Sequence, residues 1–249
     1  MDVSLYQAAA AMNASSRWQE AISENLAASQ VPGFKKQDLT FSAVQAGFMG
    51  SAARGAGSKR SEMPLASMTT NFQPGELSPT GVPTDLAVAG PGFFGVQMPD
   101  GTSGYTRNGE FHSNTQGQLV TKQGLLVMGQ SGPLQFDPKN PAPITVAPTG
   151  EVSQGGEQKG QLKLTEFNDP AALTSTGTGL FVDTGLAAQP RAASTSTVRQ
   201  GFLENANTSS MNEMGNLITA MRFFEANQKV IQTEDDRVGR LISDVANPA

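Results

Sequence analysis

Residues 207–245, NTSSMNEMGNLITAMRFFEANQKVIQTEDDRVGRLISDV, form the stretch that decides the fold. Ser210 is a candidate N-cap residue, and Glu213 follows it at the spacing of a capping box. Mostly apolar side chains then recur at alternating intervals of three and four residues, the heptad pattern of a helix that packs along another helix. We predict a helix over residues 211–245, about 50 Å long at 1.5 Å per residue. Its heptad positions are Met214, Leu217, Met221, Phe224, Gln228, Ile231, Asp235, Val238 and Ile242.

The N-terminal residues follow the same pattern. The segment 3–28 contains no Gly or Pro and is rich in good helix formers. We expect this helix to end before Val31-Pro32-Gly33, because proline restricts the preceding residue and glycine permits a turn. One such helix could cover a local core, but two at opposite ends of a chain bury their stripes best on each other or on neighbouring copies. The N-terminal heptad positions are Leu5, Ala8, Met12, Ser15, Gln19, Ile22 and Leu26.

The middle of the chain carries strand signals. From Asp85 onward, short runs of β-forming residues alternate with Gly- and Pro-rich turns. Tyr105-Thr106-Arg107 leads into Asn108-Gly109, a strong signal for a two-residue hairpin turn. Regular short strands of this kind predict an antiparallel sandwich or a barrel-like domain. The expected strands cover residues 86–88, 93–98, 118–120, 125–128, 144–146, 161–164 and 179–182.

The sequence therefore predicts an α+β fold, with long N- and C-terminal helices packed as a coiled-coil-like stalk and a central, mainly antiparallel β domain. Between the first helix and the strands, the Gly-rich stretches 47–51 and 54–60 are typical of a linker. The predicted parts are residues 1–34 as N-terminal helix and turn, 35–84 as an extended linker or assembly segment, 85–200 as a β-rich outer domain and 201–249 as the C-terminal helix.

Composition excludes several classes of function. The net charge of −5 argues against a nucleic-acid-binding protein, which needs a basic face for phosphate. The absence of cysteine excludes disulfides and thiolate metal sites. The first residues lack the basic start and the apolar core of a signal peptide, so we expect any export to proceed without a cleaved signal peptide. No stretch approaches the roughly 20 apolar residues of a membrane span.

No group of residues in the sequence predicts catalysis. His112 is the single histidine and cannot by itself form a His/Cys metal site or a His-dependent triad. A carboxylate pair of the glycosidase kind stays open, although most acidic residues of the β region lie beside Gly or Pro at predicted turns. We expect no enzyme activity, cofactor, metal or small-molecule substrate. The carboxylates in question are Asp85, Asp100, Glu110, Asp137, Glu151 and Glu166.

Three stretches resemble the flagellar rod and hook proteins of the bacterial basal body. The first, Asn25-Leu26-Ala27-Ala28-Ser29-Gln30-Val31-Pro32-Gly33-Phe34-Lys35, is similar to the family's N-terminal signature, with Ala28 and Val31 in place of the usual Asn and Thr. Residues 85–94 and Tyr105-Thr106-Arg107-Asn108-Gly109-Glu110-Phe111 resemble the opening strand and the hairpin of the family's outer domain. Gly201-Phe202-Leu203-Glu204-Asn205-Ala206-Asn207 resembles the motif that precedes the C-terminal helix. The length of the chain is that of a rod protein, because hook protein has a much longer middle.

The resemblance implies a structural subunit of the flagellar basal-body rod, which polymerises through its terminal helices into the axial drive shaft that transmits torque to the hook. It also implies other rod subunits and copies of the chain as partners, export by the flagellar type III apparatus and a periplasmic location. Residues 128–134 and 222–225 look most like the proximal rod type, and a distal rod subunit is the alternative.

Two other classes of protein stay open. A secreted β-rich binding module would need an aromatic-lined groove, and an enzyme would need converging carboxylates. If the chain is a rod protein, its assembly interface is expected on both helices and at the turn after the first helix. The expected interface residues are Leu5, Met12, Trp18, Ile22, Leu26, Pro32, Gly33, Phe34, Met214, Leu217, Met221, Arg222, Phe224, Glu225, Ile231 and Val238.

Overall fold

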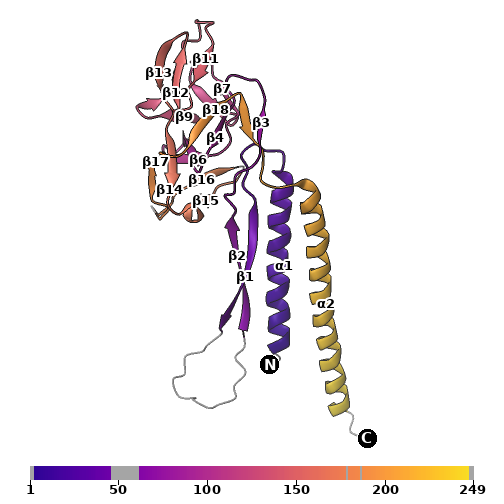
Figure 1. Ribbon diagram of the computed structural model, residues 1–249. Coiled ribbons are helices and arrows are strands. Elements are labelled where there is room, and N and C mark those ends of the chain that lie inside the picture. Colours follow the sequence, from indigo (N-terminus) through magenta and orange to yellow (C-terminus); the bar gives the residue numbers. More distant parts are fainter. Residues whose placement is uncertain (1–2, 46–61, 178, 186, 247–249) are drawn as a thin grey trace, which may run out of the picture. The chain divides into compact units, whose positions relative to one another are not determined.

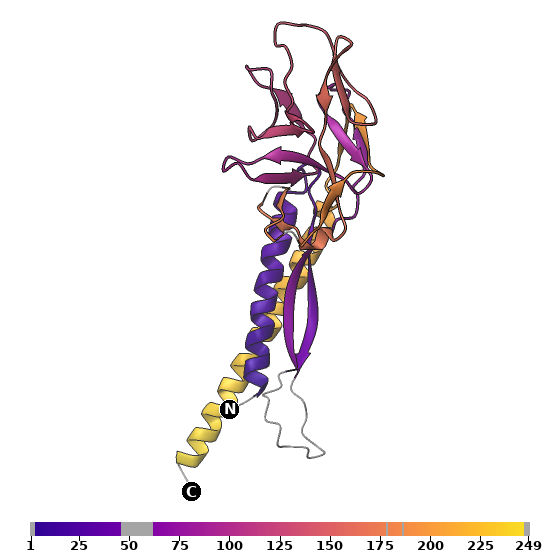
Figure 2. The same ribbon diagram turned by 90° about the vertical axis from the view of Figure 1, so that its left-hand side faces the viewer.

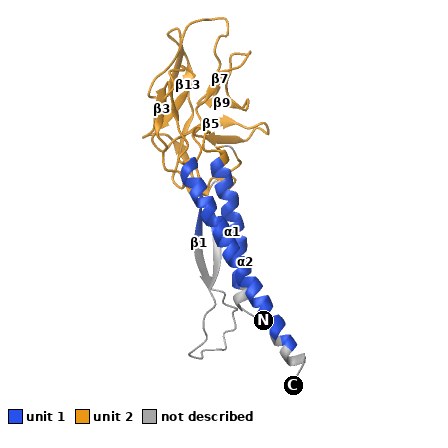
Figure 3. Ribbon diagram, turned by 90° about the vertical axis from the view of Figure 1, so that its right-hand side faces the viewer, with its two compact units in different colours: residues 1–26, 37–69, 210–249 blue, residues 27–36, 70–209 orange. Residues whose placement is uncertain are grey.

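The computed structural model describes residues 3–45, 62–177, 179–185 and 187–246 (Figure 1). It divides into two compact units, which Figure 3 shows in different colours. The helical unit comprises residues 1–26, 37–69 and 210–249, and the β unit comprises residues 27–36 and 70–209. The predicted α+β class, the mainly antiparallel β domain and the C-terminal helix are confirmed. The expected linker stretches 47–51 and 54–60 lie outside the described residues.

The helical unit contains two helices and a two-stranded sheet, namely α1 (Val3–Ala27), α2 (Ser210–Ala246), β1 (Gln37–Gln45) and β2 (Glu62–Thr70). Within this unit, α1 and α2 run side by side in both views (Figures 1 and 2). The rings of Trp18 on α1 and Phe223 on α2 lie 6.2 Å apart between centroids. Gln19 Nε2 donates a hydrogen bond to the carbonyl of Ala220 at 3.4 Å. These contacts join the helices at one level, and coiled-coil packing along their whole length stays a prediction.

Asn25 fixes the end of α1 to the start of β1. Its buried side chain donates from Nδ2 to the carbonyl of Gln37 at 2.9 Å, and its Oδ1 accepts from the amide of Gln37 at 2.8 Å. A carboxamide carries both a donor and an acceptor, so it satisfies both main-chain groups of one residue as a neighbouring strand would. The helix therefore ends at a defined point of the hairpin that follows it. Neither β1 nor β2 was predicted, although Leu39, Phe41 and Ala43 of β1 alternate with polar residues as in a half-buried strand.

The β unit is built from short strands and one 3₁₀ turn, η1 (Pro170–Ala172). The strands are β3 (Leu77–Pro79), β4 (Leu86–Ala89), β5 (Phe93–Gln97), β6 (Ser103–Thr106), β7 (Phe111–Ser113), β8 (Leu119–Thr121), β9 (Leu126–Gly129), β10 (Gly132–Pro133), β11 (Ile144–Val146), β12 (Glu151–Gln154), β13 (Glu157–Gln161), β14 (Leu164–Phe167), β15 (Thr174–Ser175), β16 (Leu180–Val182), β17 (Pro190–Ala192), β18 (Thr197–Gln200) and β19 (Phe202–Glu204).

The strands form one large sheet and three smaller ones. The large sheet has the order β15-β16-β6-β5-β9-β8-β7, with β10 on β9, and β14 pairs both β5 and β17. The smaller sheets are β11-β12-β13, β18-β4 and β19-β3. In the last two, strands near the end of the chain pair antiparallel with the first strands of the unit, Val198 opposite Val88 and Leu203 opposite Ser78. The chain therefore enters and leaves the β unit through adjacent strands.

Two hydrophobic cores lie on opposite faces of β5. Phe93 packs with Tyr105, Phe167 and Phe181 in the smaller core. Its neighbour Phe94 belongs to the larger core, which also contains residues of β4, β7, β8, β9, β12 and β18. Successive side chains of a strand point to opposite faces, so an adjacent pair of phenylalanines can serve both cores. β5 is therefore buried on both of its faces, as expected for a strand in the centre of the unit.

The predicted hairpin turn at Asn108-Gly109 is wrong. The strand before it, β6, pairs with β5 and β16, whereas β7 after it pairs with β8. Gly109 does not have the positive φ of such a turn. It is needed for a different reason, since the main chain of β4 passes directly against it: Leu86 N donates to the Gly109 carbonyl at 3.0 Å, and a Cβ on Gly109 would collide with the Leu86 carbonyl oxygen.

Replacing Phe94 by alanine tests the larger core. Phe94 is fully buried, so we expect the Phe94→Ala variant to lose about 3–5 kcal/mol of unfolding free energy, measured by urea denaturation followed by circular dichroism. The control is Val82→Ala, since Val82 is 45 % exposed and its truncation is expected to change stability by no more than about 0.5 kcal/mol. Equal small losses in the two variants would contradict this description of the core.

Candidate functional site

A buried ion cluster lies in the β unit, where three distant segments of the chain meet. Glu204 on β19 binds Lys35 through Oε1, at 2.5 Å from Nζ, and Arg107 through Oε2, at 3.2 Å from Nη1. The side chains of Lys35 and Glu204 are fully inaccessible to solvent, and that of Arg107 is nearly so. Residues 33–35, 105–109 and 201–207 come from the three stretches that carry the sequence resemblance, so the motifs meet at one place.

Main-chain groups complete the cluster. Lys35 Nζ donates to the Gln73 carbonyl at 2.8 Å, and the amide of Gly75 donates to Glu204 Oε1 at 2.8 Å. Arg107 Nη2 donates to the Gly90 carbonyl at 2.7 Å, and its guanidinium carbon lies 4.9 Å from the ring centroid of Phe93. Carbonyl oxygens and an aromatic face are favourable neighbours for a cation. They share the second positive charge, which a single carboxylate cannot neutralise.

Burial dominates the electrostatics of the two cations. It lowers the pKa of Lys35 and that of Arg107, because the charged form loses its hydration. Glu204 opposes this shift of each pKa through its charge and its hydrogen bonds. A buried carboxylate between two cations is costly to disrupt, because removing it leaves uncompensated charges in a medium of low polarity.

The main-chain segments around the cluster are in close contact with one another. Gly33 has a φ of +68° and donates from its amide to the Glu204 carbonyl at 2.6 Å. A Cβ on Gly33 would lie 2.3 Å from the carbonyl carbon of Arg107, so only glycine fits this turn. Asn207 adds a second link, since its Oδ1 accepts from the Lys36 amide at 2.7 Å and its Nδ2 donates to the Asn71 carbonyl at 2.7 Å. The segments that follow α1 and precede α2 in sequence are thereby joined within the β unit.

Glu166 is a second buried carboxylate, and it stabilises a loop. Its Oε1 accepts hydrogen bonds from the amides of Ser194, Thr195 and Ser196 at 3.0–3.2 Å and from the hydroxyls of Thr195 and Ser196 at 2.8 and 2.9 Å. Arg191 Nη2 lies 3.2 Å from Oε2. Burial by itself raises the pKa of Glu166, but the hydrogen bonds outweigh it and hold the pKa at about 2. Glu166 therefore stays ionised and has no proton to exchange near neutral pH.

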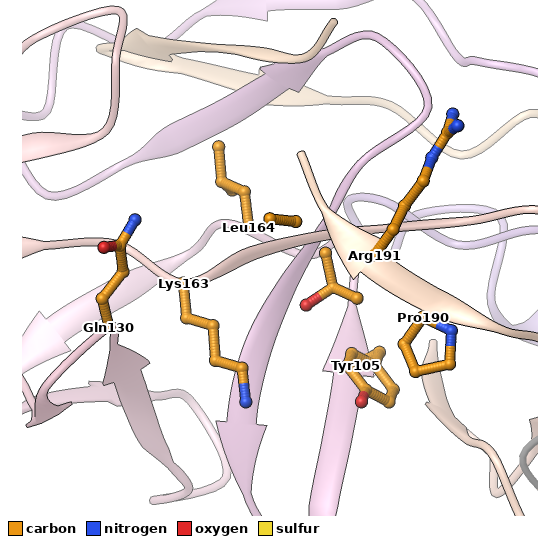
Figure 4. A pocket seen from close by; sticks show the side chains of 8 residues that line it. Tyr105, Gln130, Lys163, Leu164, Pro190 and Arg191 are labelled. Atoms are coloured by element: carbon orange, nitrogen blue, oxygen red, sulfur yellow. The ribbon is translucent and has the colours of Figure 1, made fainter. Parts of the chain in front are cut away.

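One pocket of about 420 Å³ lies beside the paired strands β14 and β17, with Tyr105 of β6 in its lining (Figure 4). None of the six carboxylates considered from the sequence lines it, and neither does His112. Burial, and to a lesser degree the charge of Asp183, raises the pKa of Tyr105, so its hydroxyl stays protonated. The lining of the pocket therefore contains no carboxylate and no histidine. Its lining residues are Tyr105, Gln130, Lys163, Leu164, Thr165, Pro190, Arg191 and Ala192.

Across the part of the chain that the structure describes, no group of His, Asp and Glu side chains could hold a metal ion. In the same residues, neither helix is long and apolar enough to cross a bilayer.

The helix α2 presents two different stripes. One is buried or half-buried, at positions that alternate by four and three residues: Glu213, Leu217, Ala220, Phe224, Asn227, Ile231 and Glu234. The other is exposed and apolar, and we call it the exposed α2 stripe: Met211 (80 % exposed), Met214 (52 %), Ile218 (56 %) and Met221 (49 %). At about 100° per residue, these four positions fall within an arc of about 80°. Beyond Glu234, the side chains that the structure describes up to Ser243 are all exposed.

The residues expected at the assembly interface divide by burial. Ile22, Gly33 and Phe34 are buried within the chain itself. The half-buried ones are Met12, Trp18, Leu26, Pro32, Leu217, Phe224 and Ile231, and the exposed ones are Met214, Met221, Arg222, Glu225 and Val238. Leu5 lies in α1, but the surroundings of its side chain are outside the described part.

Comparison with known proteins identifies the family. Residues 87–154 match the flagellar hook protein FlgE/F/G D1 domain, and residues 199–244 match the C-terminal domain of flagellar basal body rod FlgEFG proteins. The chain is 31 % identical over 252 residues to flagellar basal-body rod protein FlgG of Caulobacter vibrioides, covering 93 % of this chain and 95 % of that one. It is 32 % identical over 237 residues to rod protein FlgF of the same species, with 93 % of each chain covered. FlgG of Bacillus subtilis is 30 % identical over 259 residues, with 96 % and 98 % covered.

The chain belongs to the flagellar basal-body rod proteins. It is a structural subunit of the rod and not an enzyme, as expected from the sequence. The matched ranges cover β4 to β12 and the end of β18 through most of α2, so they include Arg107 and Glu204 of the ion cluster.

Sequence reasoning missed the ion cluster, although Lys35, Arg107 and Glu204 were each quoted inside a motif. Their separation along the chain hid the contact, and only the joint presence of one acidic and two basic residues in three motifs could have indicated it. Glu166 was considered as a possible catalytic residue, whereas its hydrogen bonds give it a structural part.

Neutralising Glu204 tests the ion cluster. In the Glu204→Gln variant, Lys35 and Arg107 stay buried without a counter-charge, so we expect a loss of about 3–5 kcal/mol of unfolding free energy in urea. The matched control is Glu157→Gln, which breaks the pair with Lys159 at the surface, where Glu157 is 75 % exposed. That control is expected to cost no more than about 1 kcal/mol. Similar losses in the two variants would show that the cluster contributes little.

Glu166 predicts a specific dependence of stability on pH. Its pKa is about 2 in the folded chain and about 4.3 when unfolded, so the unfolded state binds more protons between these values. Its contribution is complete above the unfolded pKa and is lost as pH falls toward 2. We expect the unfolding free energy of the Glu166→Gln variant, measured in urea from about pH 6 to about pH 2.5, to fall less steeply with acid than that of the parent. Parallel curves would contradict this assignment.

Proposed function

We propose that this rod subunit assembles through its terminal helices, and that the exposed α2 stripe is covered by a neighbouring copy of the chain in the rod. Four large apolar side chains on one arc of a helix are unfavourable in water, and burying them is worth about 25 cal/mol per Å². A monomer that leaves such a stripe uncovered gains stability when another subunit packs on it. This exposed stripe is the observation that carries the proposal.

The lengths of the two helices support the same idea. α2 has 37 residues and α1 has 25, so α2 is longer by about 18 Å at 1.5 Å per residue. α1 alone cannot cover α2 from end to end. The described side chains from Asp235 to Ser243 are exposed, among them Val238 and Ile242. A solvent-exposed helical segment of this length is marginal by itself, and a neighbouring subunit would stabilise it.

Repetition of one such contact builds the rod. In this proposal the contact between copies is head-to-tail, with the exposed α2 stripe of one copy packing on a different surface of the next. When the rotation between copies does not close, a contact of this type gives a helical filament. In this scheme α1 and α2 pack as a coiled-coil-like stalk with the helices of adjacent copies, and the resulting tube transmits torque to the hook.

The proposed interface includes the residues expected from the sequence, and the exposed and the buried ones have different roles in it. Met214, Met221, Arg222, Glu225 and Val238 contact neighbours directly, and half-buried residues such as Trp18, Leu26 and Phe224 are covered further on assembly. Ile22, Gly33 and Phe34 act indirectly, by holding the helix and the turn in place. Other rod subunits are partners at the two ends of the segment built from this chain. We also propose export by the flagellar type III apparatus and a location in the periplasmic part of the basal body, as the family resemblance implies.

Charged substitutions on the stripe test the proposal. We expect the double variant Met214→Asp/Ile218→Asp to raise the concentration at which the purified full chain forms sedimentable filaments by at least about tenfold, because each buried apolar side chain contributes roughly 1.5–3 kcal/mol and 1.4 kcal/mol is tenfold. The same variant is expected to leave the circular dichroism of the β unit unchanged and to abolish rods in electron micrographs of basal bodies.

The matched control is Asn212→Asp/Thr219→Asp, which places the same added charge at exposed positions of α2 outside both stripes. It should assemble at close to the parent concentration. Normal assembly of the Met214/Ile218 variant, or equal impairment of both double variants, would contradict assembly through this stripe.

A further inference from the structure

The exposed α2 stripe has an unusual composition, since three of its four side chains are methionines. Met211, Met214 and Met221 are about half exposed or more, and the fourth position, Ile218, has no reactive atom. Along the helix the sulfurs follow one another at spacings of three and seven residues, so they lie on one side. Met12, Met98 and Met128 are half-buried and less exposed than these three. Among the methionines outside α2 whose side chains the structure describes, Met68 on β2 is the exposed one, at 42 %.

We propose that Met211, Met214 and Met221 are an oxidation site at which peroxide-class oxidants block assembly of the subunit before it enters the rod. This rests on the proposed function, because the oxidised stripe matters only if a neighbouring copy covers it. The chemistry follows from exposure, since solvent-accessible thioethers are oxidised to sulfoxides more readily than covered ones.

The reaction needs only hydrogen peroxide or another two-electron oxygen donor. A sulfur lone pair attacks one peroxide oxygen, the S–O bond forms and the O–O bond breaks. The departing hydroxide takes a proton and leaves as water, so each thioether plus one H₂O₂ gives one sulfoxide plus one H₂O. The sulfur is oxidised by two electrons and the peroxide is reduced by two.

A sulfoxide changes the side chain from flexible and apolar to polar. Its oxygen is a strong hydrogen-bond acceptor, and burying it against the apolar side chains of a neighbouring copy leaves that acceptor without a donor. The stripe contains no hydrogen-bond donor of its own, because its remaining member is Ile218. Three such groups on one arc oppose the same contact, so oxidation of the free subunit weakens assembly.

The same geometry makes the effect depend on timing. In a free subunit the three sulfurs are open to solvent, whereas in the assembled rod the neighbouring copy covers them. Oxidant that arrives before assembly therefore removes subunits from the pool, and oxidant that arrives afterwards leaves the rod intact.

The test uses the purified full chain and hydrogen peroxide, with sulfoxide at each methionine measured by peptide mass spectrometry. We expect Met211, Met214 and Met221 to be oxidised at least about threefold faster than Met12, Met98 and Met128 in the free chain. The concentration needed for filaments should rise at least about tenfold after treatment, and preformed filaments should keep these three methionines reduced for longer than the free chain does. Uniform oxidation rates, or normal assembly of the oxidised chain, would overturn the proposal.

Two variants separate this site from other targets of peroxide. Met211→Leu/Met214→Leu/Met221→Leu keeps the stripe apolar at similar volume and should assemble equally well with and without peroxide. Met68→Leu removes an exposed methionine off the stripe and should stay as sensitive as the parent. Equal sensitivity of the triple variant and the parent would place the damage elsewhere. If the untreated Met214→Asp/Ile218→Asp chain assembles normally, the proposed function itself fails, and this outcome is independent of any peroxide result.

Discussion

The structure depends first on one buried carboxylate. Glu204 lies between Lys35 and Arg107 in an interior that excludes water, and each of the three charges is tolerable there only because the others are present. Lys35 follows the first helix, Arg107 belongs to the large sheet and Glu204 precedes the second helix. Their interaction therefore joins the segment that follows α1 and the segment that precedes α2 within the β unit. The main chain fits closely around Glu204, since the amide of Gly75 donates to its carboxylate and the amide of Gly33 donates to its main-chain carbonyl.

The two units differ in how completely their apolar and charged side chains are buried and paired. In the β unit, Phe93 and Phe94 occupy two cores, and the buried carboxylates Glu166 and Glu204 have several partners each. In the helical unit, α2 keeps an apolar stripe and its last turns in solvent. A subunit whose β unit has its own buried cores, and whose helix α2 leaves an apolar stripe exposed, is suited to polymerisation. In the proposed assembly, covering this stripe would supply the burial free energy that the monomer lacks.

The sequence was most informative where spacing alone determines structure. The apolar spacing and the absence of Pro predicted the bounds of α2 closely, although six of its nine predicted heptad positions are exposed. Short β-forming runs between Gly- and Pro-rich turns predicted strands such as β4, β5, β8, β9, β11 and β16, but missed others such as β3, β12, β17 and β19. It failed where contacts between distant residues decide. Asn108-Gly109 suggested a local turn, but Gly109 is required by the passage of Leu86 beside it. The ion cluster could not be located from Lys35, Arg107 and Glu204 separately, because nothing in the spacing of three distant charges predicts that they meet.

Residue-resolved amide hydrogen exchange on the free subunit tests the central claim most directly. The amide of Gly75 lies in a loop but donates to the Glu204 carboxylate, and the amide of Gly33 lies in a turn and donates to the Glu204 main-chain carbonyl. The account predicts that both exchange within about tenfold of the core amide of Gly95 on β5. The amides of residues 236–243 at the end of α2 are predicted to exchange at least about 100-fold faster than Gly95. Fast exchange at Gly33 and Gly75 would mean that the ion cluster does not organise the fold. Core-like protection at the end of α2 would mean that this part of the helix is already stable in the free subunit, without a neighbouring copy.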